Sequence, residues 1–489
     1  MIGNHISMKP HNQSRRQFLS DTGMGFTGLA LGSILAGDGV ARAAAEADWQ
    51  PPSGLPVIAP KAKSVIWLFM LGGTSHMESF DPKPALNVHA DKTFDESPFG
   101  DVLKSPFYRK NVRDFAGVPR NLMPKIYPMQ IGHRKHGQSG IEMSDWWSHL
   151  STCVDDLAIV RSMWTTDNDH AAQLQFHTGR HIFDGLHPSI GSWVHYGLGT
   201  ANHNLPQFVV MGTPPGDCCG GVGAHGASYL GPEHAGIKVS TNPANPLPFG
   251  TPGNNVYYEE RRQQLDLLNK LHGLTNVEYP NDPKMRARIQ SYELAFRMQM
   301  AVPEAVAMTG ETDATKQLYG LEGKETKTVG QQCIIARRLV ERGVRFVQIY
   351  NDGWDAHTKL FSNHSTRTGQ VDQPIAGLIK DLKQRGMLDE TLVVWATEFG
   401  RTPGAEKSDG RDHHPYGFSV WMAGGGIKSG VTHGATDELG FHAVENRHYV
   451  TDIHATVLNQ LGLNPRRLEV PGHKRLDIDF GNPINEIIA

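Results

Sequence analysis

Residues 391–401 read TLVVWATEFGR, and this stretch decides the fold. Its first seven residues form a continuous apolar run rich in β-branched side chains, which is typical of a strand buried on both faces of a parallel sheet. Glu398 and Arg401 follow this run at once. Ligands of doubly wound sheets gather at the carboxyl ends of the strands, so charged side chains here predict a functional site.

Similar apolar runs alternate with helical patterns along the chain. Strands are predicted at 64–71, 157–162, 207–211, 344–350, 391–397 and 417–422. Helices are predicted at 259–274, 283–301, 327–342, 370–385 and 449–461. The order of these elements predicts one α/β domain over residues 44–489, with a mostly parallel central sheet, helices on both faces and long loop insertions. Residues 212–255 hold 10 Gly and 7 Pro and are predicted to form a long irregular loop.

The composition is that of a globular protein close to electrical neutrality. Of 489 residues, 39% are apolar and 20% charged, and the formal net charge is −3. This balance gives no electrostatic reason to expect a nucleic-acid partner. The four cysteines form no Cys-x-x-Cys pair, so a thiolate zinc site is not expected, while a disulfide between Cys153 and Cys333 is left open.

The first 43 residues have the pattern of an export signal. Arg15 and Arg16 resemble a twin-arginine motif, an apolar Gly-rich stretch follows at 24–35, and small residues at 41 and 43 suit a signal peptidase. We therefore predict a twin-arginine signal peptide at 1–43 and a periplasmic or extracellular mature protein. No other stretch approaches 18 apolar residues, so no integral membrane segment is expected in the mature protein.

Carboxylates and imidazoles recur beside the predicted strands. Asp355 and His357 follow strand 344–350, Glu398 follows strand 391–397, and His413 and His414 precede strand 417–422. These five residues are the predicted metal ligands, for a divalent ion such as zinc, manganese or calcium. Each also has a simpler interpretation: Asp355-x-His357 as a turn, Glu398 as the partner of a nearby arginine, and His413-His414 as an exposed turn.

The same segments contain longer motifs in a characteristic order. They are Gly72-Gly73-x-Ser75-His76-x-Glu78, Asp355-x-His357, Thr397-Glu398-Phe399-Gly400-Arg401-Thr402-Pro403, Asp412-His413-His414-Pro415-x-Gly417 and Trp421-Met422-Ala423-Gly424-Gly425-Gly426. Over residues 63–485 the chain resembles the exported, sulfatase-like family of unknown function (domain of unknown function 1501) in the alkaline-phosphatase superfamily. This resemblance implies an α/β sandwich whose metal site activates a nucleophile against a phosphate or sulfate ester.

The chain departs from the superfamily pattern at the metal site. Phe399 stands where the superfamily has a histidine, and His413 or His414 would have to supply the missing nitrogen. The aspartate that normally follows the first strand is absent, so Glu78 or His76 would have to replace it.

The nucleophile position departs from the pattern as well. The sulfatase spacing places Asp169 where a Cys or Ser is expected, which excludes formylglycine chemistry. Thr165, Thr166 or a metal-bound water are the remaining candidates, although Asp169 could equally cap the helix that follows. His170 is the predicted general acid or base, and Arg401 is predicted to hold the anionic oxygens.

Two functions from different classes follow from these residues. One is a metal-dependent hydrolase of phosphate or sulfate esters without a formylglycine nucleophile, acting on a small-molecule or polysaccharide substrate. The other is a non-catalytic descendant that binds an anion or a partner. Compared with the superfamily pattern, Glu398 replaces an aspartate, Phe399 a histidine and Asp169 a cysteine, and these three replacements favour the second.

Overall fold

A computed structural model of the chain describes residues 52, 54–105, 125–247, 259–260, 262–263, 266–267, 270, 297–299 and 301–489. The predicted signal peptide at 1–43 lies outside the described residues. The helices predicted at 259–274 and 283–301 lie mostly outside them as well.

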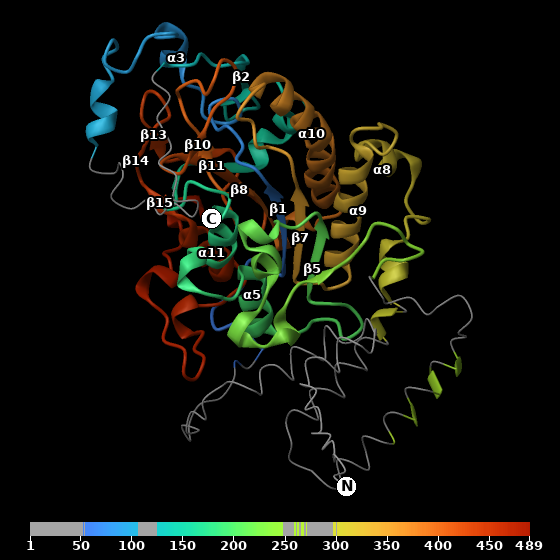
Figure 1. Cartoon of the computed structure of the whole chain (residues 1–489). Coiled ribbons are helices and arrows are strands. Elements are labelled where there is room, and N and C mark those ends of the chain that lie inside the picture. The colour runs from blue at the N-terminus through green and yellow to red at the C-terminus, as the bar shows by residue number, and fades with distance from the viewer. Residues whose placement is uncertain are drawn as a thin grey trace, which may run out of the picture.

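The predicted strands meet in one nine-stranded sheet of order β12-β4-β11-β8-β1-β7-β5-β6, with β15 also paired to β4 (Figure 1). Its strands are β1 (Ser64–Met70), β4 (Leu157–Trp164), β5 (Phe208–Gly212), β6 (Ile237–Lys238), β7 (Phe346–Asn351), β8 (Thr391–Thr397), β11 (Phe418–Ala423), β12 (Val431–His433) and β15 (His448–Tyr449). The apolar stretch 391–397 is β8, and β8 is buried along its whole length between β1 and β11.

One strand of this sheet runs against the others. β11 pairs antiparallel with both β4 and β8, whereas the remaining pairs in the sheet are parallel. The predicted α/β fold with a mostly parallel sheet is therefore confirmed. Because β11 is reversed, its N-terminal end lies at the edge where the parallel strands have their carboxyl ends. Residues before β11 therefore meet residues after β7 and β8.

Helices cover both faces of the sheet (Figure 1). α4 (Ala172–Thr178), α5 (Ile190–Leu198) and α11 (Val450–Gln460) pack on one face, and α9 (Lys327–Glu341) and α10 (Leu360–Gln384) on the other. In β1, Trp67 and Phe69 belong to the hydrophobic cluster on the side of α4, α5 and α11, whereas Leu68 and Met70 belong to the cluster on the side of α9 and α10. Successive side chains of a strand point to opposite faces, so a continuous apolar run serves both clusters.

Shorter elements surround the sheet. They are α3 (Pro84–Val88), α8 (Asp313–Leu318), β2 (His133–His136) with β3 (Ile141–Ser144), β9 (Gly400–Arg401) with β10 (His413–His414), and β13 (Ala435–Thr436) with β14 (Ala443–Glu445). Up to residue 247, the loop predicted at 212–255 contains four short 3-10 helices and β6.

The cysteines and the membrane prediction can be checked on the described residues. Cys218 and Cys219 are joined by a disulfide. Cys153 and Cys333 are buried free thiols, so the bond left open between them is not formed. Among the helices described, none is long and apolar enough to span a membrane.

Candidate metal centre

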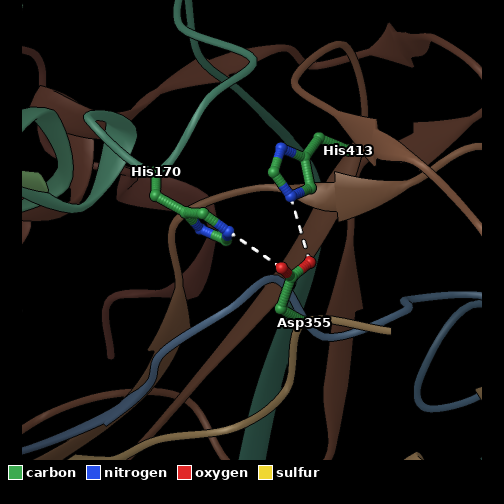
Figure 2. A group of neighbouring side chains, drawn as sticks. All are labelled: His170, Asp355 and His413. Carbon is green, nitrogen blue, oxygen red and sulfur yellow. Dashed lines mark hydrogen bonds and ion pairs between the residues drawn. The ribbon is translucent and has the colours of Figure 1, made fainter. Parts of the chain in front are cut away.

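Asp355 lies at the centre of the site, in the loop that follows β7. Three imidazoles approach its carboxylate: His170 Nε2 lies 3.2 Å from Oδ2, and His357 Nε2 and His413 Nε2 lie 3.0 and 3.1 Å from Oδ1. Figure 2 shows His170 and His413 reaching the carboxylate from two sides. These four residues are called the Asp355 cluster below. They come from the loop after β4, the loop after β7 and β10, so the reversed direction of β11 brings them together.

Each imidazole is held through its other ring nitrogen. Nδ1 of His170 lies 3.2 Å from Glu398 Oε1, and Nδ1 of His357 lies 2.5 Å from Glu406 Oε2. Nδ1 of His413 lies 2.9 Å from the backbone oxygen of residue 168. An Nδ1 that faces an oxygen acceptor carries the hydrogen, so in the neutral form of each ring the Nε2 lone pair points at the carboxylate of the cluster.

This arrangement requires positive charge between the rings and the carboxylate. His357 Nε2 and His413 Nε2 are only 3.0 Å apart, so their lone pairs repel each other as well as the oxygens of Asp355. Protons relieve this repulsion only in part, because two protonated imidazoles at this separation repel in turn. A divalent cation accepts all the lone pairs at once, and it is the species that the donor set fits.

The pKa values of the cluster reflect the same repulsion between nitrogen lone pairs and carboxylate oxygens. Burial opposes the charged form of His170, but hydrogen bonds to Asp355 and Glu398 outweigh it and raise its pKa to about 9. For His357, burial also disfavours the charged form, but the hydrogen bond to Asp355 outweighs it, so the pKa of His357 is raised. Burial alone would raise the pKa of Asp355, yet the bonds from the three imidazoles hold it far below its usual range.

The charge count around the cluster also favours a cation. Four carboxylates lie in the cluster or against it, whereas Arg401 supplies the one arginine side chain in contact with Asp355; the carboxylates belong to Asp355, Glu398, Glu406 and Asp412. Two groups of possible metal ligands share His413: one adds His170 and Asp355, the other His357 and Asp412. The structure therefore contains side chains placed to hold a metal ion.

Two glycines allow the loops to approach closely enough to form the cluster. Gly72 has a φ of +123°, and a Cβ there would lie 2.4 Å from the backbone nitrogen of Asp355. Its N–H donates to Glu398 Oε1 at 2.8 Å. A Cβ on Gly410 would lie 2.0 Å from the backbone oxygen of His357. Neither position accepts a side chain, since backbone atoms fill the space.

The cluster is buried on one side and open on the other. The side chain of His413 is 1% exposed, whereas those of His170, His357 and Asp355 are 23%, 26% and 37% exposed. Phe399 packs against His413, with ring centroids 4.4 Å apart. Catalytic metal sites keep a position open to solvent and substrate, whereas structural sites are closed.

Comparison with known proteins places the chain in a family. Residues 62–488 match the family described as "Protein of unknown function (DUF1501)". The chain belongs to this family. Among proteins with curated descriptions, none matches it.

Several solved structures resemble this family member at low identity. An alkaline phosphatase from the Antarctic bacterium TAB5 is 10% identical, with 83% of this chain and 99% of that chain covered and a TM-score of 0.34. The PsFucS1 sulfatase from Pseudoalteromonas sp. is 10% identical over 95% of this chain and 74% of that chain, with a TM-score of 0.36. The zinc complex of the C-terminal periplasmic domain of EcEptC from Escherichia coli is 10% identical over 90% and 96%, with a TM-score of 0.34.

Two of the predicted metal ligands in this family member lie outside the Asp355 cluster. His414 neighbours His413 in β10, and because adjacent side chains of a strand point to opposite faces, its Nε2 contacts the backbone oxygen of Phe441 instead. His414 is therefore not among the residues that meet at Asp355. Glu398 lies behind His170, accepting from Gly72 N, from Gln173 Nε2 at 2.8 Å and from His170 Nδ1. Glu398 thus occupies the position of a carboxylate that orients a metal-binding histidine, here His170.

The predicted catalytic roles also change. Arg401 is fully buried: Nε donates to Gly73 O, Nη1 to Arg411 O and Nη2 to Asp355 Oδ1, at 2.8, 3.0 and 2.7 Å. It holds Asp355 and cannot reach a substrate anion. His170 directs Nε2 at Asp355 and Nδ1 at Glu398, which suits a metal ligand better than the predicted acid or base.

The candidate nucleophiles have other partners. Asp169 Oδ1 accepts from the N–H of His170 at 2.8 Å, two residues before the N-cap of α4 at Ala171. Thr165 donates to Gln175 Oε1 at 2.8 Å, and Thr166 accepts from Gln175 Nε2 at 2.6 Å.

The replacements considered for the missing aspartate lie elsewhere. Glu78 is buried in an ion pair with Arg411 at 2.8 Å, and His76 Nε2 contacts the backbone oxygen of Gly440 at 2.8 Å. Neither belongs to a candidate group of metal ligands among the described residues.

Two residues that hold the cluster were not predicted from the sequence. Glu406 orients His357 from the turn between β9 and β10, and Gln173 holds Glu398 from the first turn of α4. Glu406 follows no strand, so the strand-end pattern did not identify it. Gln173 lies three residues after His170, a spacing that would place both on one side of a helical turn.

Proposed function

We propose that this protein is a metal-dependent hydrolase of phosphate or sulfate esters that works without a formylglycine nucleophile. The observation that supports this most is the convergence of three imidazole Nε2 atoms on the carboxylate of Asp355, each with its Nδ1 bound to an oxygen. A hydrogen bond from Nδ1 to an oxygen fixes the tautomer and orientation of a metal-binding histidine.

In this proposal the Asp355 cluster holds one divalent ion. Three nitrogens and one carboxylate favour zinc over calcium or magnesium, which take oxygen ligands. When bound, the metal would polarise an ester oxygen and lower the pKa of a water molecule toward about 7. Arg401 fixes the Asp355 carboxylate from the buried side, while Glu398 and Glu406 fix His170 and His357. The exposed side is left for a small-molecule or polysaccharide ester.

A second function, non-catalytic binding of an anion or a partner, is favoured by one observation. The Arg401 guanidinium is committed to protein oxygens, and the hydroxyls of Thr165 and Thr166 are bound to Gln175. A metal held in the cluster could still bind an anion, but these residues supply no side-chain nucleophile to attack it.

Metal analysis and activity together separate the two functions. The protein is purified without chelator, its metal content is measured, and aryl phosphates and aryl sulfates are tested with wild type, Asp355→Asn and His149→Gln. His149 is exposed and belongs to none of the metal groups found among the described residues, so it is a matched control. Metal-dependent hydrolysis lost only in Asp355→Asn supports the hydrolase. Bound metal with no turnover of either ester supports the binding function.

We further propose that the chain is exported by the twin-arginine route and that residues 1–43 are removed. The paired Arg15 and Arg16 support this. Lysine at both positions should leave the full-length protein in the cytoplasm, as immunoblots of cell fractions would detect. Unchanged export of the variant would contradict the assignment.

A further inference from the structure

A second pair of histidines faces each other at the edge of the central sheet. β12 and β15 both pair with β4, which places His433 beside Val160 and His448 beside Met163. The two strand segments thus lie in succession along one strand, and their imidazoles meet with Nε2 atoms 2.9 Å apart. Glu486, at the C-terminal end of the chain, places Oε2 3.9 Å from His433 Nε2.

The ring of His448 is oriented by a carboxylate. Its Nδ1 lies 3.1 Å from Asp452 Oδ2, one helical turn along, and Asp452 Oδ1 in turn accepts from the N–H of Asn482 at 2.8 Å. Nδ1 of His448 therefore carries the hydrogen, and the lone pair of Nε2 points at His433. A carboxylate–histidine pair that directs a bare Nε2 toward a second imidazole is the arrangement that typically supports a metal ligand.

We propose that His433, His448 and Glu486 form a second divalent-metal site, of the zinc class, independent of the Asp355 cluster. One donor atom from each of the three residues lies within 4.8 Å of the others, and the group shares no residue with the two groups around His413. Two imidazoles and one carboxylate are a donor set that zinc takes in proteins, with water in the fourth position.

The two imidazoles are largely buried, whereas the carboxylate is open to solvent. His433 is 9% exposed and His448 15% exposed, and Glu486 is 60% exposed. The neighbouring Lys428 ammonium donates to the backbone oxygen of Glu486 at 2.9 Å.

Such an ion would join three segments that are distant in sequence. It would tie the end of β12 to the start of β15 and to the 3-10 helix Asn485–Ile487 near the C-terminus. β12 and β15 are only three and two residues long and lie at the sheet edge, where short strands have few hydrogen bonds to hold them. The site therefore stabilises the edge of the sheet.

The test isolates this site by removing the other. In the mature protein carrying both Asp355→Asn and His413→Gln, which together break both groups around His413, one equivalent of Zn²⁺ should bind and raise the thermal midpoint. Adding His433→Gln and His448→Gln should abolish both effects. Glu486→Gln, at an exposed position that folding tolerates, should weaken Zn²⁺ binding by about tenfold or more. Adding His149→Gln instead should leave binding unchanged.

Other results would overturn the proposal. One is the absence of stoichiometric Zn²⁺ binding in the protein carrying Asp355→Asn and His413→Gln. Another is full retention of Zn²⁺ affinity in both the double-histidine and the Glu486→Gln variants. If the double-histidine variant fails to fold, the Glu486→Gln titration alone decides, and unchanged affinity there overturns the proposal.

Discussion

Two charged groups lie at the same edge of the central sheet and differ in how their charges are matched. The Glu78–Arg411 pair is fully buried, with Nη2 2.8 Å from Oε1. The remaining guanidinium hydrogens are donated to backbone oxygens of residues 127, 128, 402 and 403. The Asp355 cluster, in contrast, opens to solvent and directs three nitrogen lone pairs at one carboxylate.

This difference separates a structural role from a chemical one. Burial disfavours the charged form of Glu78, but the contacts with Arg411 outweigh it, so its pKa is lowered and the pair stays ionised. One positive and one negative charge cancel, and their hydrogen bonds are made within the protein. In the Asp355 cluster the ligands are oriented but the charge is unmatched. The matched pair should therefore matter for stability and the unmatched cluster for metal binding.

The largest expected effect is on hydrolysis when the centre of the cluster is altered. Asp355→Asn should lower the rate by on the order of 10³-fold, because the metal supplies several kcal/mol of transition-state stabilisation. The free energy of unfolding of the metal-free protein should change far less, since Asp355 is partly exposed. Esterase assays and denaturant titration measure the two quantities. Retained activity in this variant would mean that the chemistry lies elsewhere.

The opposite result is expected for the matched pair. Arg411→Met leaves Glu78 buried without its counter-ion and should lower the free energy of unfolding by about 3–5 kcal/mol. The double variant Glu78→Leu/Arg411→Met should recover part of this loss, because no lone charge remains buried. Urea denaturation at constant pH measures both. A loss below about 1 kcal/mol in the single variant would contradict the structural role of the pair.

A smaller effect is expected for Glu398, which contacts the proposed ligand His170. Glu398→Gln keeps the shape but removes the charge that orients His170, and it should weaken metal affinity by about 10- to 100-fold. Competition with a chromophoric chelator measures this affinity. A complete loss of binding, equal to that in Asp355→Asn, would show instead that Glu398 is itself a ligand.

The smallest effect, compared over a single pH unit, is a pH dependence of metal affinity. The pKa of His170 is about 9 in the folded protein, above the value of about 6.5 expected after unfolding. Its contacts with carboxylates thus stabilise the metal-free protein fully below about pH 6.5 and are lost as the pH rises through about 9. Metal must displace this proton, so affinity should rise about tenfold per pH unit up to about 9 and then level off. A flat profile over this range would exclude His170 as a ligand.

Much of the fold could be predicted because the apolar runs are long and continuous. Stretch 391–397 is β8 without any shift, and helix 327–342 is α9 to within one residue. α10 begins ten residues before the helix predicted at 370–385. The prediction missed these residues because the first half of α10 is polar and contains Gly369 before Pro374. Packing against α9 and the sheet outweighs these weak local signals.

The sequence predicts where in the fold the site lies, but it does not decide which of the candidate side chains form it. Strand ends identified Asp355, His357 and His413 as candidates, but the choice between His413 and His414 depends on which face of β10 each occupies. That choice is set by the pairing of β10 with β9, with His413 opposite Arg401, which local sequence does not contain. The burial of Arg401 likewise depends on the loops after β1 and β7, which supply the oxygens that it binds.

The most direct test of the central claim is anomalous X-ray diffraction from crystals of the mature protein loaded with Zn²⁺. We expect an anomalous peak at bonding distance, about 2.0–2.2 Å, from Nε2 of His170, His357 and His413 and from a carboxylate oxygen of Asp355. We expect no such peak at the cluster in crystals of Asp355→Asn treated in the same way. An empty Asp355 cluster in Zn²⁺-loaded wild-type crystals would contradict the proposal that this cluster holds a metal ion.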